Sequence, residues 1–252
     1  MIWLRSAAFN MWFYGITVVL ALFGTVVQLG PSSWSRVISR CWARWVLAGL
    51  KPLCGITIAI SGREHLPAAG PALIASQHQS AFDTMVWLVL APAPAYVLKQ
   101  ELTRIPLFSV MIRKLAMIVV DRSAGAAAIR SLLRGADAAV AQGRHIVIFP
   151  EGTRAAPGTS LPLHPGIAAL ATRTGLPVIP VVTDSGLRWG RRAFRKLPGV
   201  IHVAIQPPLP IGLPRAVLME RLAALYAGGV DAVGNSVDST ASGFSAHSRT
   251  AI

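Results

Sequence analysis

Two residues five positions apart, His78 and Asp83, form the clearest acid–base pattern in the chain. They lie in the stretch ASQHQSAFD at residues 75–83, between two apolar runs. When a carboxylate holds one nitrogen of an imidazole, the tautomer is fixed and the other nitrogen can act as a base. A structural role is also open, because Ser80 and Asp83 have the spacing of a helix capping box and an acid suits the start of a helix.

A second polar stretch, FPEGTR at residues 149–154, directly follows an apolar run. Gly152 permits a backbone turn that other residues resist. Glu151 and Arg154 place opposite charges in this short loop, and the planar fork of an arginine suits a phosphate group. The same residues could form a solvated salt bridge in an ordinary turn. Backbone N–H groups near residues 151–153 are candidates to stabilise a developing oxyanion.

A third group is basic and consists of Lys99, Arg104 and Arg122. Lys99 and Arg122 each follow a predicted strand, so they could face the same crevice as His78. They could equally be surface charges whose stems cover apolar area.

Several familiar kinds of catalytic site are missing from the sequence. It has no G-x-S-x-G elbow, no histidine at metal-ligand spacing from His78, and no phosphate-binding glycine loop. We therefore expect no metal and no cofactor. A base without an enzyme nucleophile, beside cations that suit a phosphate, favours direct transfer of a group to a hydroxyl of the substrate.

These residues need a scaffold, and from residue 56 onward short apolar runs alternate with longer helical patterns. This alternation predicts an α/β fold, a layered domain with a mostly parallel sheet flanked by helices. His78 would lie where a strand ends, which is the usual ligand side of such sheets. We expect strands at residues 56–61, 72–76, 95–98, 117–120, 145–149, 178–182 and 200–206, and helices at 81–90, 106–115, 124–142, 166–173 and 214–226.

The amino-terminal part differs from this domain, because residues 6–35 contain no charged side chain. Residues 7–29 exceed the roughly 20 apolar residues that span a bilayer core and are too long for a signal peptide. They predict a hydrophobic, membrane-anchoring helical segment. More basic residues follow this run than precede it, which places the rest of the chain in the cytoplasm. Those at four-residue spacing predict an interfacial helix on anionic headgroups: Arg36, Arg40 and Arg44.

The composition agrees with a membrane partner. The 252 residues carry 24 basic against 10 acidic side chains, yet only 13% are charged and 53% are apolar. Such a balance points to a polyanionic partner, and the apolar fraction favours anionic membrane lipids over nucleic acid. We expect three parts: membrane-anchoring and interfacial helices at 1–55, an α/β domain at 56–226, and a disordered tail at 227–252, which is rich in Gly, Ser, Ala and Thr.

Four blocks in a fixed order now identify a resemblance. HQSAFD at residues 78–83 resembles the H-x4-D signature of the glycerolipid acyltransferase superfamily, and FPEGTR resembles its E-G-T-R block. KQEL with IP and MIVVDR, beginning at Lys99 and Met117, resembles the acceptor-binding block, and LPVIPVV at 176–182 resembles the later proline-containing strand. The chain departs from the common pattern at Gln77, Ser109, Ala116 and His164.

The resemblance, which is greatest to bacterial members, implies the following expectations. A fatty acyl group would pass from acyl-CoA or acyl carrier protein to the sn-2 hydroxyl of lysophosphatidic acid, giving phosphatidic acid at the bacterial inner membrane. His78 would be the general base and Asp83 would hold its imidazole. The remaining residues would bind the acceptor: Arg154, Arg122 and Lys99, with Glu151, Gly152 and Thr153 in the same loop.

Other functions stay open at this point. The acceptor could be a different lysophospholipid or a lyso-ornithine lipid, because the four blocks would look nearly the same. The chain could also bind membranes without catalysis, although His78 and Asp83 argue against that. A serine hydrolase is disfavoured, since Ser76 and Ser80 lack the elbow context.

Overall fold

The computed structural model describes residues 1–27, 30–105 and 108–240. Three expectations extend beyond these residues. The end of the anchor at 28–29, the start of the helix expected at 106–115, and residues 241–252 of the expected tail all lie outside the described residues.

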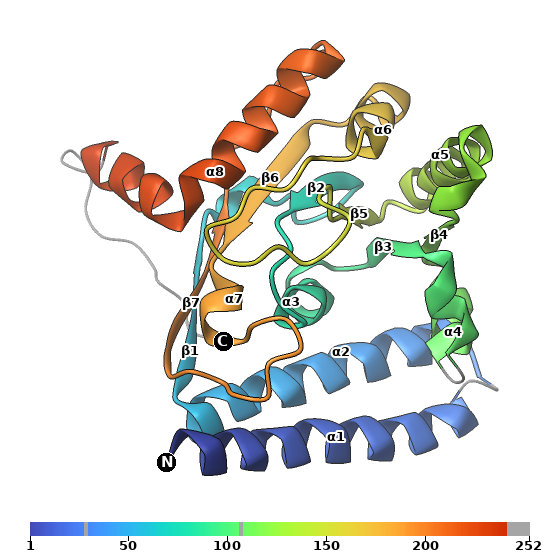
Figure 1. Ribbon diagram of the computed structural model, residues 1–252. Helices are drawn as coiled ribbons and strands as arrows, with labels where there is room; N and C mark the ends of the chain where they lie inside the picture. The colour runs from blue at the N-terminus through green and yellow to red at the C-terminus, as the bar shows by residue number, and fades with distance from the viewer. Residues whose placement is uncertain (28–29, 106–107, 241–252) are drawn as a thin grey trace.

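The described part contains one seven-stranded sheet with the order β1-β7-β6-β2-β5-β3-β4 (Figure 1). All neighbouring strands are parallel except β6 and β7, which are antiparallel. The expected mostly parallel α/β fold is therefore confirmed. The strands are β1 (Ile56–Ser61), β2 (Ala72–Ser76), β3 (Pro94–Lys99), β4 (Ile118–Val120), β5 (His145–Ile148), β6 (Val178–Thr183) and β7 (Gly199–Ile205).

The central strands β2, β5 and β6 are buried along their whole length. This is why they read as continuous apolar runs instead of alternating ones. The helices are α1 (Ile2–Val27), α2 (Ser32–Gly49), α3 (Phe82–Leu90), α4 (Phe108–Lys114), α5 (Ala126–Ala141), α6 (Gly166–Thr174), α7 (Ser185–Arg188) and α8 (Arg215–Thr240). Short π and 3-10 turns occupy Leu50–Cys54, Arg63–His65, Gln100–Arg104 and Arg122–Ala124.

Two hydrophobic cores cover the two faces of the sheet (Figure 1). On one face, α3 packs with α1 and α2, and its Phe82 and Trp87 are fully buried. On the other face, α5, α6 and α8 pack through residues such as Leu132, Leu170 and Leu222. Each face of the sheet is thus closed, while the strand ends remain free to form a site.

Helices α1 and α2 form an antiparallel hairpin beneath the α/β domain (Figure 1). The indole N–H of Trp12 donates to the carbonyl of Trp45, and that of Trp42 donates to the hydroxyl of Thr17, both at 3.0 Å. The segment Ile2–Gly24 has the length and apolar composition of a membrane-crossing helix.

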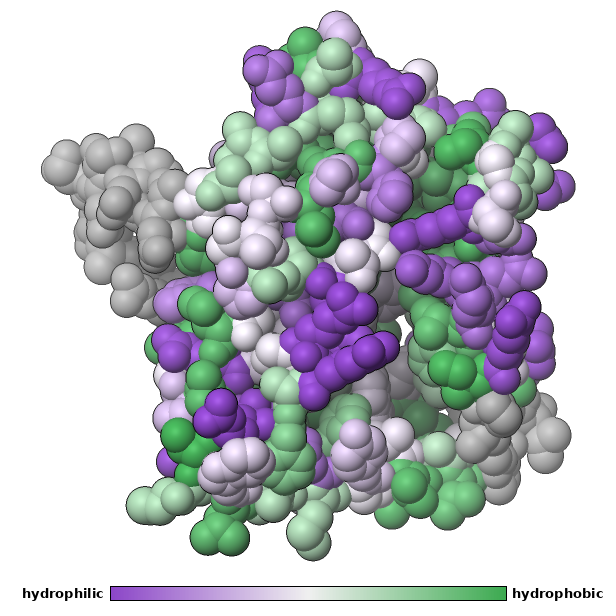
Figure 2. All heavy atoms as spheres, in the orientation of Figure 1, coloured by the Kyte–Doolittle hydropathy of each residue, from purple (hydrophilic) through white to green (hydrophobic). Residues whose placement is uncertain are grey.

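The amino-terminal half of α1 is nevertheless fixed to the domain. Phe9 is fully buried against the ring of Trp189, and the Ser6 hydroxyl accepts the backbone N–H of Lys196 at 2.9 Å. The opposite side of α1 remains exposed, and hydrophobic side chains gather along this edge of the molecule (Figure 2). Its exposed large residues are Leu4, Met11, Tyr14, Val18, Val19, Leu22 and Phe23.

The three arginines expected on one face of α2 do not act together. Arg36 and Arg44 are exposed. Arg40 instead turns toward the end of α3 and donates to the carbonyl oxygens of Leu88, Ala91 and Pro92 at 2.7–3.2 Å. These carbonyls end a helix and need donors, and the guanidinium supplies them. The interpretation that Arg40 faces lipid headgroups is therefore wrong.

The carboxyl-terminal boundary also differs from the expectation. Helix α8 continues past residue 226 to Thr240, with a break at Gly229, where φ is +64° and ψ is −170°. The paired glycines at 228 and 229 interrupt the helix without ending it, because glycine tolerates this backbone conformation. The small polar residues that follow did not indicate a helix from their pattern.

Candidate active site

His78 and Asp83 lie together at the carboxyl end of β2. His78 is in the loop after the strand, and Asp83 is in the first turn of α3. Nδ1 of His78 is 3.1 Å from Oδ2 of Asp83, and the two side chains are 15% and 2% exposed. Nε2 makes no hydrogen bond to any residue that the structure describes. The imidazole is therefore fixed at one nitrogen and available at the other.

The carboxylate of Asp83 is held by more than the histidine. Its Oδ2 accepts the backbone N–H groups of Gln79 and Ser80, both at 2.7 Å, and its Oδ1 accepts the hydroxyl of Ser185 at 2.6 Å. Four hydrogen-bond partners around one buried carboxylate hold it in a fixed position. Asp83 therefore both closes the loop before α3 and orients the imidazole. One side chain thus contacts both the loop before α3 and the imidazole.

The FPEGTR loop lies directly over His78. The backbone N–H of His78 donates to Oε2 of Glu151 at 2.7 Å, and its carbonyl accepts the N–H of Ala155 at 2.8 Å. The ring of Phe149 stacks on the imidazole with centroids 4.3 Å apart. Two loops separated by about 70 residues are thus joined at the histidine itself, which fixes the direction of its ring.

Glu151 is buried at 4% exposure and has an unusual acidity. Burial, and to a smaller extent the negative charge of Asp83, raise the pKa of Glu151 to about 7 against the opposing hydrogen bond from His78. Burial also raises the pKa of Tyr226 of α8, with Glu151 adding to the effect, and the Tyr226 hydroxyl donates to the carbonyl of Ala75 at 2.9 Å. A carboxyl group with such a pKa changes its charge near neutral pH.

Gly152 adopts φ +68° and allows the loop to approach a basic side chain. Nη1 of Arg122 donates to the carbonyl of Gly152 at 2.8 Å. A Cβ at this position would collide with Nη1 of Arg122 and with the imidazole of His164. The N–H of Gly152 donates to Phe149 at 2.9 Å within the turn, so it is already engaged and is not a free oxyanion donor.

Arg154 belongs to a cationic group near the histidine. Burial lowers the pKa of Arg154, the positive charges of Arg191 and Arg192 lower it further, and Asp83 opposes them. None of these three guanidinium groups forms a salt bridge with an acid in the described part of the chain. Three cations without an acidic partner make a local positive potential that suits a doubly charged anion.

The remaining predicted site residues lie farther from His78. Lys99 is exposed at the end of β3 and pairs in register with Val120, two residues before Arg122. No hydrogen bond joins it to His78 in the part of the chain that the structure describes. Thr153 is exposed at the tip of its loop. The structure thus groups Glu151, Gly152 and Arg154 with the His78–Asp83 pair, and Arg122 through Gly152.

The basic cluster at residues 188–196 divides in the structure. Arg191 and Arg192 are near enough for their charges to lower the pKa of Arg154, whereas Arg188 donates to the carbonyls of Pro198 and Val200 at 3.3 Å. Lys196 is buried and donates to Asn10 of α1 and to two carbonyls of its own loop. Two arginines of this cluster therefore lie near Arg154, and its lysine fixes α1 to the domain.

None of the nearby serines is placed as a nucleophile for His78. Ser76 accepts the indole N–H of Trp87, Ser80 accepts the N–H of Phe82, and Ser185 donates to Asp83. The described residues contain no group of three or more His, Cys, Asp or Glu side chains arranged to hold a metal ion. The arrangement is chemically able to accept a proton from a hydroxyl group brought to Nε2, beside a loop that carries Arg154.

Two residues of the site could not be found from local patterns. Ser185 is 102 residues from Asp83, and Tyr226 is 151 residues from Ala75. The only sequence signal for Ser185 is its position just after the strand β6, at the same end of the sheet as His78. Tyr226 lay at the end of an amphipathic helix and had no chemical signal.

Known proteins share both the sequence blocks and the fold of this chain. A family model described as Acyltransferase matches residues 57–184. The chain is 33% identical over 174 residues to the 1-acyl-sn-glycerol-3-phosphate acyltransferase of Pseudomonas aeruginosa, which covers 69% of this chain and 67% of that protein. The protein of the same name from Limnanthes alba is 35% identical over 62% of this chain and 56% of its own length.

Two further similarities extend this comparison. The human 1-acyl-sn-glycerol-3-phosphate acyltransferase alpha is 28% identical over 66% of this chain and 60% of its own length. The chain thus spans less than two thirds of its plant and human relatives. The crystal structure of the 1-acyl-sn-glycerophosphate (LPA) acyltransferase PlsC from Thermotoga maritima superposes with a TM-score of 0.75, covering 93% of this chain and 98% of that one, at 22% identity. The last similarity extends the shared fold to the α1–α2 hairpin.

Proposed function

This chain belongs to the acyltransferase family, and we propose that it transfers a fatty acyl group to the sn-2 hydroxyl of lysophosphatidic acid, giving phosphatidic acid. The observation that carries the proposal is the His78–Asp83 pair at 3.1 Å, next to a loop whose Arg154 forms no salt bridge with an acid of the described chain. The names of the bacterial, plant and human relatives support the same acceptor.

His78 acts as the general base in this proposal. Nε2 takes the proton of the sn-2 hydroxyl while the oxygen attacks the carbonyl carbon of an acyl thioester. The tetrahedral intermediate then collapses, the carbon–sulfur bond breaks, and the thiol leaves with the proton from His78. Asp83 stabilises the imidazolium that forms between the two steps. Because no serine among the described residues is hydrogen-bonded to the His78 side chain, direct attack by the substrate hydroxyl is favoured over an acyl-enzyme.

The acceptor phosphate is bound by Arg154 in this proposal, with Arg191 and Arg192 adding positive potential. A phosphomonoester carries close to two negative charges at neutral pH, which matches a group of cations without an acidic partner. A zwitterionic lyso-ornithine lipid would leave this charge uncompensated. Arg122 supports the same loop through Gly152 and, with Lys99, extends the positive edge of the sheet. Thr153 is exposed in the same loop, at the entrance of the proposed acceptor site.

The hairpin of α1 and α2 attaches the domain to the membrane surface in this proposal. The exposed apolar side of α1 and the exposed Trp34 and Trp45 of α2 suit the interfacial region. Crossing the bilayer would detach Phe9 and Ser6 from the domain, so we propose that the hairpin lies in one leaflet. The basic residues that follow the apolar run favour the cytoplasmic side of a bacterial inner membrane.

The acyl donor in this proposal is acyl-CoA or acyl carrier protein. Both are acidic, and the chain has a formal net charge of +14 that would attract either to the membrane surface. The positive surface suits the two donors equally.

A panel of acceptors with one acyl donor tests the proposal. Purified protein is given lysophosphatidic acid, lysophosphatidylcholine, lysophosphatidylglycerol or a lyso-ornithine lipid, and acyl transfer is measured by mass spectrometry. We expect kcat/KM to be highest for lysophosphatidic acid by at least about tenfold, as one charge-assisted contact to the phosphate provides. Equal or higher values for a zwitterionic acceptor would overturn the proposed specificity.

A further inference from the structure

A cavity of about 260 Å³ lies between α2 and the amino ends of β3, β4 and β5. Pro94 begins β3, Met117 precedes β4, and Arg144 precedes β5, and all three line the cavity. His78 and Glu151 lie at the opposite, carboxyl ends of the strands. The cavity is therefore separate from the proposed site of acyl transfer.

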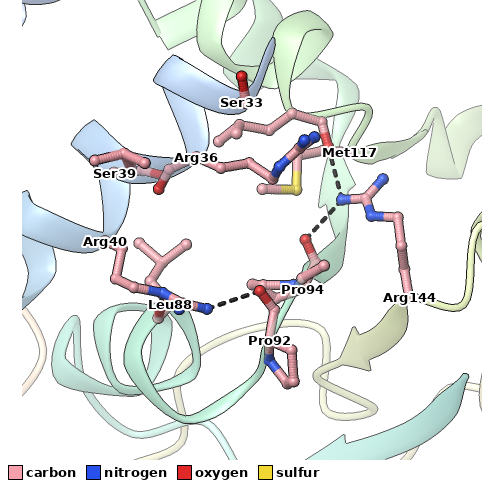
Figure 3. A pocket seen from close by; sticks show the side chains of 12 residues that line it. Ser33, Arg36, Ser39, Arg40, Leu88, Pro92, Pro94, Met117 and Arg144 are labelled. Atoms are coloured by element: carbon pink, nitrogen blue, oxygen red, sulfur yellow. Dashed lines mark hydrogen bonds between the residues drawn. The ribbon is translucent and has the colours of Figure 1, made fainter. Parts of the chain in front are cut away.

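The lining of the cavity joins cations to apolar side chains. Arg36, Arg40 and Arg144 contribute guanidinium groups, and none of the described residues that line the cavity is acidic. Arg40 is engaged by the carbonyls at the end of α3. The guanidinium groups of Arg36 and Arg144 are directed toward one another, beside Met117 (Figure 3). Two like charges that face each other repel, unless an anion lies between them.

Arg144 is fixed in this position and only 8% exposed. It donates through Nη1 to Ala116 and through Nη2 to Pro94 and Leu115, at 2.7–2.9 Å. A guanidinium has five N–H donors, so two of them remain without a partner in the described chain. Burial, and then the positive charge of Arg36, lower the pKa of Arg144. A buried donor of this kind favours an acceptor with negative charge.

Arg36 is the less firmly held of the two arginines. It is exposed, and its one described hydrogen bond is a long one of 3.4 Å to the hydroxyl of Ser32. The arginine can therefore close over a bound group without breaking a strong contact. Two guanidinium forks on opposite sides match the oxygen atoms of a phosphate.

The surroundings of the cavity suit a lipid. Val37 lines it and is 61% exposed, and the neighbouring Trp34 is 54% exposed on the same helix. Because α1 and α2 are antiparallel, the exposed apolar residues Leu22 and Phe23 lie beside this half of α2. Ligand pockets usually hold about 300–1,000 Å³, so the cavity fits a headgroup while the acyl chains remain in the leaflet.

We propose that Arg36 and Arg144 bind the phosphate of an anionic phospholipid, and that this second site fixes how the domain sits on the membrane. The inference rests on the proposed membrane attachment but not on the identity of the acyl acceptor. The bound lipid is neither substrate nor product at this site, because His78 is at the other end of the sheet.

The test compares two arginines of the same helix. Arg36→Gln removes a cation that lines the cavity, and Arg44→Gln removes an exposed cation that does not line it. Binding of dihexanoyl phosphatidylglycerol, used as a monomer in solution, is measured by calorimetry with the full chain in both variants. We expect saturable binding in the natural protein, unchanged binding in Arg44→Gln, and about 10–100-fold weaker binding in Arg36→Gln.

Three further measurements distinguish the sources of the effect. Inorganic phosphate should bind more weakly than the lipid, and equal affinity would overturn the lipid assignment. Affinity for phosphatidylcholine vesicles containing phosphatidylglycerol should fall about fivefold in Arg44→Gln, as expected for one surface charge, and further in Arg36→Gln. Equal losses in the two variants would overturn a specific site. Turnover of a short-chain lysophosphatidic acid in solution should be the same in both variants, and a selective loss in Arg36→Gln would assign the cavity to catalysis and overturn the proposal.

Discussion

The hydroxyl of Ser185 donates a hydrogen bond of 2.6 Å to Oδ1 of Asp83, while Oδ2 of the same carboxylate lies 3.1 Å from Nδ1 of His78. Ser185 begins α7, and the preceding Asp184 is held by both the backbone N–H and Nδ1 of His202 at 2.7 Å. The carboxylate that orients the base is thus tied, through α7, to the strand β7. Ser185 thus contacts Asp83 from a segment 102 residues farther along the chain.

Ser185→Ala should lower kcat by about 10–100-fold and leave both KM values nearly unchanged, because a hydrogen bond to a charged group is worth about 1.5–3 kcal/mol. The loss would arise from a less firmly oriented Asp83, since the described hydrogen bond of the Ser185 hydroxyl goes to that carboxylate. Steady-state kinetics with both substrates varied measure this split. Ser131→Ala, which removes a hydroxyl bonded to the carbonyl of Val119 outside the site, is the matched control. A change confined to KM would contradict the role assigned to Ser185.

Arg154→Gln should raise the KM for lysophosphatidic acid by about 10–100-fold, since a charge-assisted contact to the phosphate is lost. The KM for the acyl donor should not change. The control is Arg173→Gln, which removes a surface arginine paired with Asp137 at 2.8 Å, and we expect neither constant to move. If the donor constant alone rises in Arg154→Gln, the phosphate lies elsewhere.

Gly152→Ala should destabilise the protein more than Gly158→Ala. Both glycines have positive φ, at +68° and +76°, so both substitutions strain the backbone by about 1–2 kcal/mol. A Cβ at Gly152 also meets Arg122 and His164, whereas one at Gly158 meets no atom within 4 Å. Overpacking typically costs about 1–3 kcal/mol. Urea unfolding of the two variants measures the difference, and equal losses would mean that Arg122 moves aside freely.

Glu151 should make stability fall as the pH rises. Its pKa is about 7 in the folded protein against an ordinary value of 4.5. The folded state therefore binds more protons than the unfolded state between these values, and the free energy of unfolding decreases through that pH range. At about 1.4 kcal/mol per pH unit, the loss is at most ~3 kcal/mol.

Glu151→Gln keeps the shape and the oxygen that accepts the N–H of His78, but it cannot ionise. Its unfolding free energy, measured by urea at pH 5 and at about pH 8, should lack most of the decrease seen in the natural protein. Identical pH dependence in the two proteins would show that Glu151 is not the group responsible.

Much of the sheet could be predicted because its strands are short apolar runs separated by polar turns. The runs at β2, β5 and β6 are apolar throughout, as expected of parallel strands covered on both faces. The position of His78 and Glu151 at the carboxyl ends of strands follows from the same pattern. The contact between their loops is set by the strand order, in which β2 and β5 are neighbours.

Other features depend on contacts that no local pattern records. The spacing of Arg40 on its helix predicts a cation at the membrane surface, and Lys196 lies in an equally basic stretch of sequence. The structure buries their charged ends among carbonyl oxygens, which satisfy the end of α3 and the loop that contacts α1. Ser185 has no motif around it, and its role arises only when β6 brings it beside α3. The charge and spacing of residues in the sequence therefore indicate which side chains could take part in a site. Long-range contacts between elements determine which of these side chains lie near His78.

The central claim is that His78 acts as the general base for transfer to the acceptor hydroxyl. The direct measurement is the turnover of purified His78→Ala with saturating lysophosphatidic acid and acyl-CoA, together with its circular dichroism and urea unfolding. Loss of a general base predicts a decrease in kcat of about 10²–10⁴-fold. The fold should be retained, since the His78 side chain makes its described contacts with Asp83 and Phe149. A folded His78→Ala protein with near-normal turnover would contradict the account.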